Sequence, residues 1–223
     1  MLKAKGQRPK EEKTRQARRW GAAALVVLAI GAHAHQAHAA DTPLVAALKR
    51  GDTAAVRTLL GRRADVNAAD PTGTTALHWA VQANHVDVVR QLLAAGANVR
   101  AANRYGITPL QLAAVNGDAA MAKLLLASGA DPNATLPEGE TVLMTAARTG
   151  VAEVVGILLE AGANVNATET LYGETALHWA AAENHAEAVA VLVKRGAPVD
   201  VRSATEKFPR RRSGQSVLSL GNW

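Results

Sequence analysis

The chain has 223 residues, of which 48% are hydrophobic and only 3% aromatic, so its apolar content is mostly Ala, Val and Leu. It contains no cysteine, which excludes disulfides, thiolate metal sites and a cysteine nucleophile. Residues 1–40 hold eight basic and two acidic residues and so account for the whole net charge of +6, whereas residues 41–200 hold twelve basic and sixteen acidic residues. A negative body has no broad phosphate-binding face, which excludes nucleic acid as the expected partner.

The first 39 residues have the order of a secretory signal peptide. A basic stretch precedes an apolar run from Trp20 to Ile30, and a small-residue stretch ends in Ala37-His38-Ala39. We therefore expect cleavage between Ala39 and Ala40 and an exported mature protein, with the periplasm as its location and no membrane contact after cleavage. Arg18-Arg19 leaves the choice between the general and the twin-arginine export route open.

The alternative for this segment is an uncleaved membrane anchor, which would make the protein a membrane-tethered adaptor. The apolar run has eleven residues, whereas a spanning helix needs about 20. Three histidines follow the run, and we interpret them as part of a removed leader and not as a metal site; they are His33, His35 and His38.

The rest of the chain repeats itself with a period of 33 or 34 residues. A Gly or Asn stands nine residues after each opening Thr, and a Gly-Ala pair follows later in four of the five units. Each unit opens with Thr and has Leu two positions later, the five Thr being Thr42, Thr75, Thr108, Thr141 and Thr175. A fixed period of this length predicts a stacked repeat architecture.

Each landmark has a physical role. Thr is a good N-cap, and Pro in the first helical turn, as at Pro43 and Pro109, removes no hydrogen bond. Gly or Asn can adopt the left-handed conformation that ends a helix. The helices expected between these signals are too short to be stable alone, so each must bury its apolar face against the next unit. The expected fold is an all-α solenoid of about five helix–turn–helix units with short extended fingers.

The motifs resemble the ankyrin repeat. Thr75 to Ala80 and Thr175 to Ala180 are similar to its T-P-L-H-x-A motif, and Gly162 to Ala167 is similar to its closing G-A-x-V-N-A. With the predicted leader, the chain is similar to exported ankyrin-repeat proteins of bacterial type. The resemblance covers residues 41 to about 203. It implies structural roles for the histidines, with the signature ones bonding the backbone of a neighbouring turn; the four are His78, His85, His178 and His185.

The expected organisation has four parts. Residues 1–39 are the signal peptide, 40–70 an N-terminal capping repeat, 71–203 repeats two to five, and 204–223 an irregular basic tail. Gly221-Asn222-Trp223 resembles the residues before an opening Thr, so we hypothesise that a further repeat once followed and that the chain is truncated. The fifth repeat would then lack a covering neighbour, and such an apolar face tends to self-associate.

No catalytic motif is apparent. The sequence has no G-x-S-x-G, phosphate-binding loop, G-x-G-x-x-G or H-E-x-x-H. We therefore expect no enzymatic activity, no cofactor and no metal. A hydrolase or metal-dependent enzyme on a repeat scaffold is the alternative.

The family resemblance implies a protein-binding scaffold that contacts its partner with fingertips and with the exposed ends of first helices. Tyr105 and Tyr172, the two tyrosines of the chain, fall on fingertips, and Tyr is over-represented among binding hot spots. The fingertip candidates are Pro71, Thr72, Thr74, Arg104, Tyr105, Ile107, Pro137, Glu138, Glu140, Leu171, Tyr172 and Glu174. The helix-end candidates are Gln82, Val115, Asn116, Arg148, Thr149 and Glu183.

Overall fold

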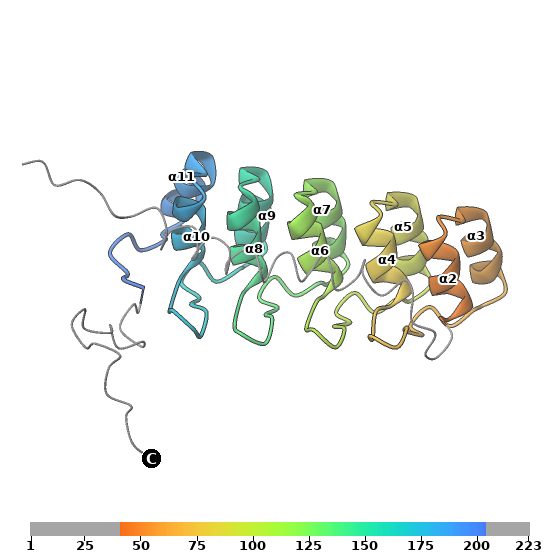
Figure 1. Ribbon diagram of the computed structural model, residues 1–223. Coiled ribbons are helices and arrows are strands. Elements are labelled where there is room, and N and C mark those ends of the chain that lie inside the picture. The colour runs from red at the N-terminus through yellow and green to blue at the C-terminus, as the bar shows by residue number, and fades with distance from the viewer. Residues whose placement is uncertain (1–40, 204–223) are drawn as a thin grey trace, which may run out of the picture.

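The computed structural model describes residues 41–203, which form an all-α solenoid of ten helices in five stacked pairs (Figure 1). We call the pairs repeats 1 to 5. The first helices are α2 (Pro43–Lys49), α4 (Ala76–Gln82), α6 (Pro109–Asn116), α8 (Val142–Thr149) and α10 (Ala176–Ala182). The second helices are α3 (Thr53–Gly61), α5 (Val86–Ala94), α7 (Ala119–Ala127), α9 (Ala152–Glu160) and α11 (Ala186–Lys194). The predicted leader, with its Ala39–Ala40 cleavage site, and the predicted tail 204–223 lie outside the described residues.

The opening threonines are the N-caps of the first helices, as predicted. The hydroxyls of Thr42, Thr108 and Thr141 accept hydrogen bonds from backbone N–H groups three residues later, at 3.2–3.3 Å. Pro43 and Pro109 occupy the first turns of α2 and α6. These caps satisfy backbone groups that a helix of seven or eight residues would otherwise leave unpaired.

The predicted left-handed residues are also confirmed. Asn84 and Asn184 have φ of 53° and 61°, and Gly150 ends α8 with φ of 79°. A side chain at Gly150 would in addition collide with the imidazole of His185. That ring lies close because its Nε2 donates to the carbonyl of Arg148 at 3.0 Å, so Gly150 is required both by the turn and by the contact with repeat 5.

One continuous apolar core runs through all five repeats. The leucine two positions after each opening Thr is its regular element: Leu44, Leu77, Leu110 and Leu143 are at most 2% exposed. Leu177 of repeat 5 is only partly buried, because no described element covers the outer face of that repeat. The expected self-association through this face stays a prediction.

The signature histidines join repeats 2 and 5 to the chain that follows each of them. The Nε2 of His78 lies 2.9 Å from the carbonyl oxygen of Ile107, and that of His178 lies 2.9 Å from the carbonyl oxygen of Val201. A carbonyl can only accept, so Nε2 carries the proton and Nδ1 accepts from the opening Thr at 3.1–3.2 Å. The structural role that the resemblance implied is therefore confirmed for both.

His78 gives the fold a pH dependence that can be measured. Burial lowers the pKa of His78 below its ordinary value of 6.5, only partly offset by the bond to Ile107. Below about pH 6.5 the unfolded chain therefore takes up a proton that the folded protein does not, and the free energy of unfolding falls as the pH falls. We predict that His78→Gln flattens this dependence between pH 6.5 and 5 in urea denaturation.

The matched control for this experiment is His178→Gln. His178 is partly exposed and makes the equivalent bonds to Thr175 and Val201, so its replacement measures the cost of losing the same hydrogen bonds in repeat 5. Identical pH profiles for the unmodified protein and His78→Gln would contradict the assignment.

Candidate protein-binding surface

Between consecutive repeats the chain forms fingers that project on one side of the array (Figure 1). Finger 2 comprises residues 70–74, finger 3 residues 103–107, finger 4 residues 136–140 and finger 5 residues 169–174. In each finger the backbone N–H of the first residue donates to the carbonyl of the last at 2.9–3.0 Å. The fingers are therefore closed turns and not open loops.

Three of the four fingers are also capped by their first side chain. The Oδ1 of Asp70 accepts from the N–H groups of Thr72 and Thr74, and that of Asn103 accepts from those of Tyr105 and Ile107, at 2.9–3.0 Å. The carboxylate of Glu169 accepts three backbone N–H groups of finger 5 at 2.6–3.0 Å. Finger 4 begins with Leu136, which has no oxygen for this role.

Neighbouring fingers are joined by backbone hydrogen bonds with one interruption. The N–H of Arg104 donates to the carbonyl of Thr72 at 2.9 Å, and the N–H of Thr170 donates to that of Glu138 at 3.0 Å. Pro137 stands at the same place in finger 4 and has no N–H. Finger 4 is therefore joined to finger 5 but lacks the bond that would join it to the carbonyl of Tyr105 in finger 3.

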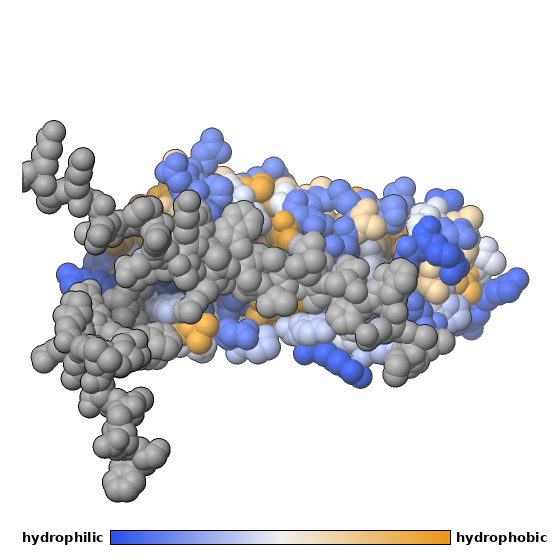
Figure 2. Space-filling view, in the orientation of Figure 1, coloured by the Kyte–Doolittle hydropathy of each residue, from blue (hydrophilic) through white to orange (hydrophobic). Residues whose placement is uncertain are grey.

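The largest predicted contact residues are exposed on these fingers. Tyr105 is 42% exposed, Leu171 53% and Tyr172 37%. Hydrophobic atoms reach the surface at the fingertip below α10 in Figure 2. Four of the other predicted contact residues are exposed: Arg104, Asn116, Pro137 and Glu138. Eight more are half-buried: Pro71, Thr72, Gln82, Val115, Arg148, Thr149, Glu174 and Glu183.

Three predicted contact residues are buried, and their placement at the exposed tips is wrong. Thr74 and Ile107 are each 1% exposed and Glu140 is 5% exposed. Each is the last residue of its finger, directly before the helix cap, so its side chain turns into the array. The hydroxyl of Thr74, for example, accepts from the Nδ2 of Asn103 at 3.3 Å.

Arg148 has an internal role that the sequence did not indicate. Its guanidinium lies 3.5 Å from the carboxylate of Glu140 and 5.5 Å from the centroid of the Trp179 ring. Lys49 makes a similar set of contacts: its Nζ is 2.8 Å from the carboxylate of Asp41, which like Glu140 directly precedes an opening Thr, and 4.8 Å from the centroid of the Trp79 ring. It also lies 3.3 Å from the carboxylate of Asp70 in finger 2. Each cation therefore contacts the Trp ring of the following repeat and a carboxylate before its own helix.

A spacing rule could have identified both pairs. In each case the cation stands seven residues after an opening Thr, and the Trp stands four residues after the next one. Sequence reasoning placed Arg148 among the partner contacts and missed Lys49, because it considered each repeat separately and not the pair that packs together.

The carboxyl group of Glu140 is buried, and its pKa is shifted by its surroundings. Burial raises the pKa of Glu140 above its ordinary value, and the nearby carboxylates Glu138 and Glu169 raise it further. The hydrogen bond from Thr145, at 2.6 Å, and the charge of Arg148 oppose this shift. The acidic groups of fingers 4 and 5 are therefore close enough to influence one another.

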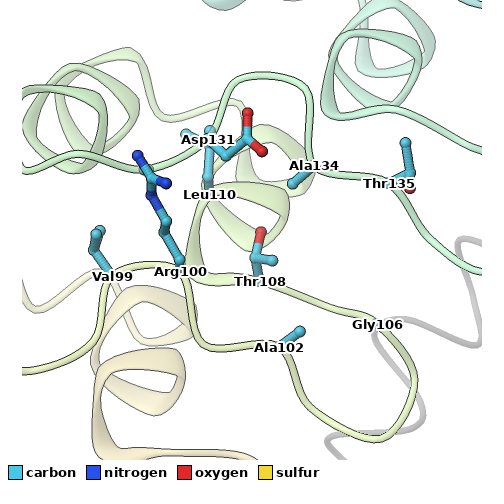
Figure 3. A pocket seen from close by; sticks show the side chains of 10 residues that line it. Val99, Arg100, Ala102, Gly106, Thr108, Leu110, Asp131, Ala134 and Thr135 are labelled. Carbon is cyan, nitrogen blue, oxygen red and sulfur yellow. The ribbon is translucent and has the colours of Figure 1, made fainter.

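Two hollows lie on the described part of the chain. One of about 240 Å³ lies between the loops of repeats 3 and 4, lined by Arg100, Leu110 and Asp131 among others, and the Asp131 carboxylate points away from the Arg100 guanidinium (Figure 3). The other, of about 440 Å³, lies at repeat 1 and is lined by Asp41, Leu44 and Asp65 among others. Within residues 41–203 no three His, Asp or Glu side chains form a group that could hold a metal. None of the helices in this range is long and apolar enough to cross a membrane.

Comparison with known proteins agrees with this geometry. The family model described as ankyrin repeats (3 copies) matches residues 16–103, 44–135 and 110–203. The chain belongs to the ankyrin-repeat family. Ankyrin repeats are protein-interaction scaffolds and are typically non-catalytic. The first match begins at residue 16 and so includes part of the segment predicted to be a leader.

Curated relatives match over a shorter stretch. Osteoclast-stimulating factor 1 of Rattus norvegicus and that of Sus scrofa are each 44% identical over 55 residues, which is 25% of this chain and 26% of the relative. The matched stretch thus spans about a quarter of the relatives' own length. It supports the shared repeat and says nothing of a shared partner.

The finger caps predict a graded effect of substitutions at Asp70. Hydrogen bonds from Thr72, Thr74 and Lys49 outweigh the effect of burial and lower the pKa of the Asp70 carboxyl. Asp70→Asn should keep the backbone caps, as Asn103 does in finger 3, and lose the pairing with Lys49, at a cost of about 1 kcal/mol in the free energy of unfolding. Asp70→Ala should lose both, at a cost of about 2–3 kcal/mol.

Urea denaturation near pH 7 measures both variants. The conclusion would be contradicted if Asp70→Asn were as destabilising as Asp70→Ala, because the backbone caps would then contribute nothing.

Proposed function

We propose that this protein is an exported scaffold that binds a partner protein with its fingertips and the adjoining ends of its first helices, without catalysis of its own. The observation that carries the proposal is the exposure of Tyr105, Leu171 and Tyr172 on closed fingers. Large apolar side chains at such tips contribute nothing to the core of the array. Aromatic anchors on a fixed backbone are, however, what a protein interface uses.

The rigidity of the fingers supports this proposal. Fingers 2, 3 and 5 are each held by a closing backbone bond and a side-chain cap, so their tips lose little conformational freedom when a partner binds. A partner would therefore meet a preorganised surface, and its affinity would depend on which side chains the tips carry.

The sequence of residues 1–39 supports export, since a basic stretch, an apolar run and an A-x-A box follow in that order. Residues 16–39 also fall within the first family match, so the same segment has a rival assignment as part of the array. Cleavage separates the two, because a removed segment cannot belong to the mature solenoid.

Replacing both Tyr105 and Tyr172 with Ala should weaken capture of the partner about tenfold or more, since truncation of a contributing interface residue costs about 1 kcal/mol or more. The melting temperature should change by less than about 2 °C, because exposed side chains contribute little to stability. Capture is measured by crosslinking in the exported fraction followed by affinity purification. The matched control is Arg57→Ala with Arg90→Ala, two exposed residues of the second helices α3 and α5.

If the control variant lost capture of the partner and the tyrosine variant did not, the binding surface would lie on the second helices and not on the fingers. Equal capture by all variants would leave the fingertips without a role.

The mature N-terminus tests the export part of the proposal. A chain with a C-terminal affinity tag, purified from the exported fraction, should begin at Ala40 in intact-mass measurement. A chain that begins at Met1 would contradict export by a cleaved leader and favour the assignment of residues 16–39 to the array.

A further inference from the structure

We propose that fingers 3, 4 and 5 form a docking surface for a cationic segment of a partner protein, one whose Lys or Arg residues alternate with apolar side chains. This inference rests on the proposed function and adds the chemistry of the partner.

The charge of the array changes sign along its length. Residues 41–107 hold eight basic and five acidic residues, whereas residues 108–203 hold five basic and eleven acidic residues. Fingers 4 and 5 contain four Glu and no basic residue, whereas fingers 2 and 3 contain Asp70 and Arg104. Of the four Glu, Glu138 is exposed and Glu174 half-buried, whereas Glu140 and Glu169 are buried. The field at the second half of the finger row therefore attracts cations.

Apolar and acidic groups lie on adjacent tips. The N–H and the hydroxyl of Thr170 both donate to the carbonyl of Glu138, at 3.0 and 2.8 Å, so fingers 4 and 5 are in direct contact. Glu138 is exposed on finger 4, next to Leu171 and Tyr172 on finger 5. A segment that covers these tips would bury the side chains of Leu171 and Tyr172 and at the same time place one of its own side chains beside the carboxylate of Glu138.

Finger 3 extends the surface on the other side of finger 4. Its tip carries Tyr105, whose carbonyl receives no backbone bond from finger 4, because Pro137 stands where fingers 3 and 5 have the donors Arg104 and Thr170. The surface between fingers 3 and 4 thus presents a backbone acceptor beside an exposed ring. Carboxylates and a carbonyl are all acceptors, so the complementary segment supplies donors, and charged donors make the stronger bonds.

The Trp rings do not take part in this recognition. Each of the two that face neighbouring first helices already has a cation of the array over it, Lys49 over Trp79 and Arg148 over Trp179. The partner's cations are therefore expected at the carboxylates of the tips and not on these rings.

Three labelled twelve-residue peptides test the proposal against the full chain by fluorescence anisotropy. The first alternates Arg with Leu, the second has Glu in place of Arg, and the third has Ser in place of Leu. We expect the Arg–Leu peptide to bind about tenfold or more tightly than either matched peptide, with an affinity that falls as salt rises. Tighter binding of the Glu–Leu peptide, or equal binding of all three, overturns the proposal.

Charge reversal locates the site. Glu138→Lys with Glu174→Lys should weaken binding of the Arg–Leu peptide about tenfold. The control Glu153→Lys with Glu187→Lys changes the net charge equally but on the second helices α9 and α11 of the same two repeats, and it should have less than about a twofold effect. Equal losses in both variants would show a response to net charge alone and overturn the site. Glu138→Lys alone, on an exposed tip, gives the same test with about a threefold loss if the double variant does not fold.

The basic residues 207–212 of the chain itself are the rival occupant. If replacing Arg210, Arg211 and Arg212 with Ala strengthened peptide binding about tenfold, the tail would be the ligand of this surface and the partner proposal would be overturned. A partner that is captured through Tyr105 and Tyr172 but is insensitive to Glu138→Lys would also overturn the charge proposal while leaving the proposed function intact.

Discussion

Each described helix is nine residues long or shorter, and the whole structure depends on the stacking that this shortness requires. A helix of two turns does not hold itself together in water, so its stability comes from the apolar face that it shares with neighbours. This is why Leu44, Leu77, Leu110 and Leu143 are almost completely buried while Leu177, with no described neighbour on one side, is not.

Because the repeats are held together by their stacked helices, the exposed finger residues are not needed to stabilise the core. The core lies between the helices, so the fingers contribute closure bonds and caps but little apolar burial. Their outward residues can vary with little cost to the fold, and here they include the aromatic Tyr105 and Tyr172, the aliphatic Leu171, the acidic Glu138 and the basic Arg104. Finger 4 differs from the other fingers at Leu136, which removes its side-chain cap, and like finger 2 it has Pro at the second position, where Pro137 removes the bond to finger 3. Pro137 thus leaves the carbonyl of Tyr105 without a backbone donor from finger 4 at the centre of the proposed docking surface.

The fold could be predicted from the sequence because its determinants are local and repeated. A Thr cap, a left-handed Gly or Asn and a buried Leu act within one repeat, and five copies remove the ambiguity of any single one. The candidate surface could be predicted only in part, because burial at a fingertip depends on the next repeat. The last residue of each of fingers 2, 3 and 4 turns inward; these residues are Thr74, Ile107 and Glu140. The cations that contact the Trp rings, Lys49 and Arg148, also have partners some 20 to 30 positions away in the sequence. Neither fact follows from reading one repeat at a time.

If the partner binds on the fingers and the stacked helices serve as a fixed support, hydrogen exchange of the protein, free and in complex with its captured partner, will show it. We expect added protection of backbone amides in residues 103–107, 136–140 and 169–174, with exchange of the second helices unchanged. Added protection confined to α5, α7 and α9, with the fingers exchanging as in the free protein, would contradict it.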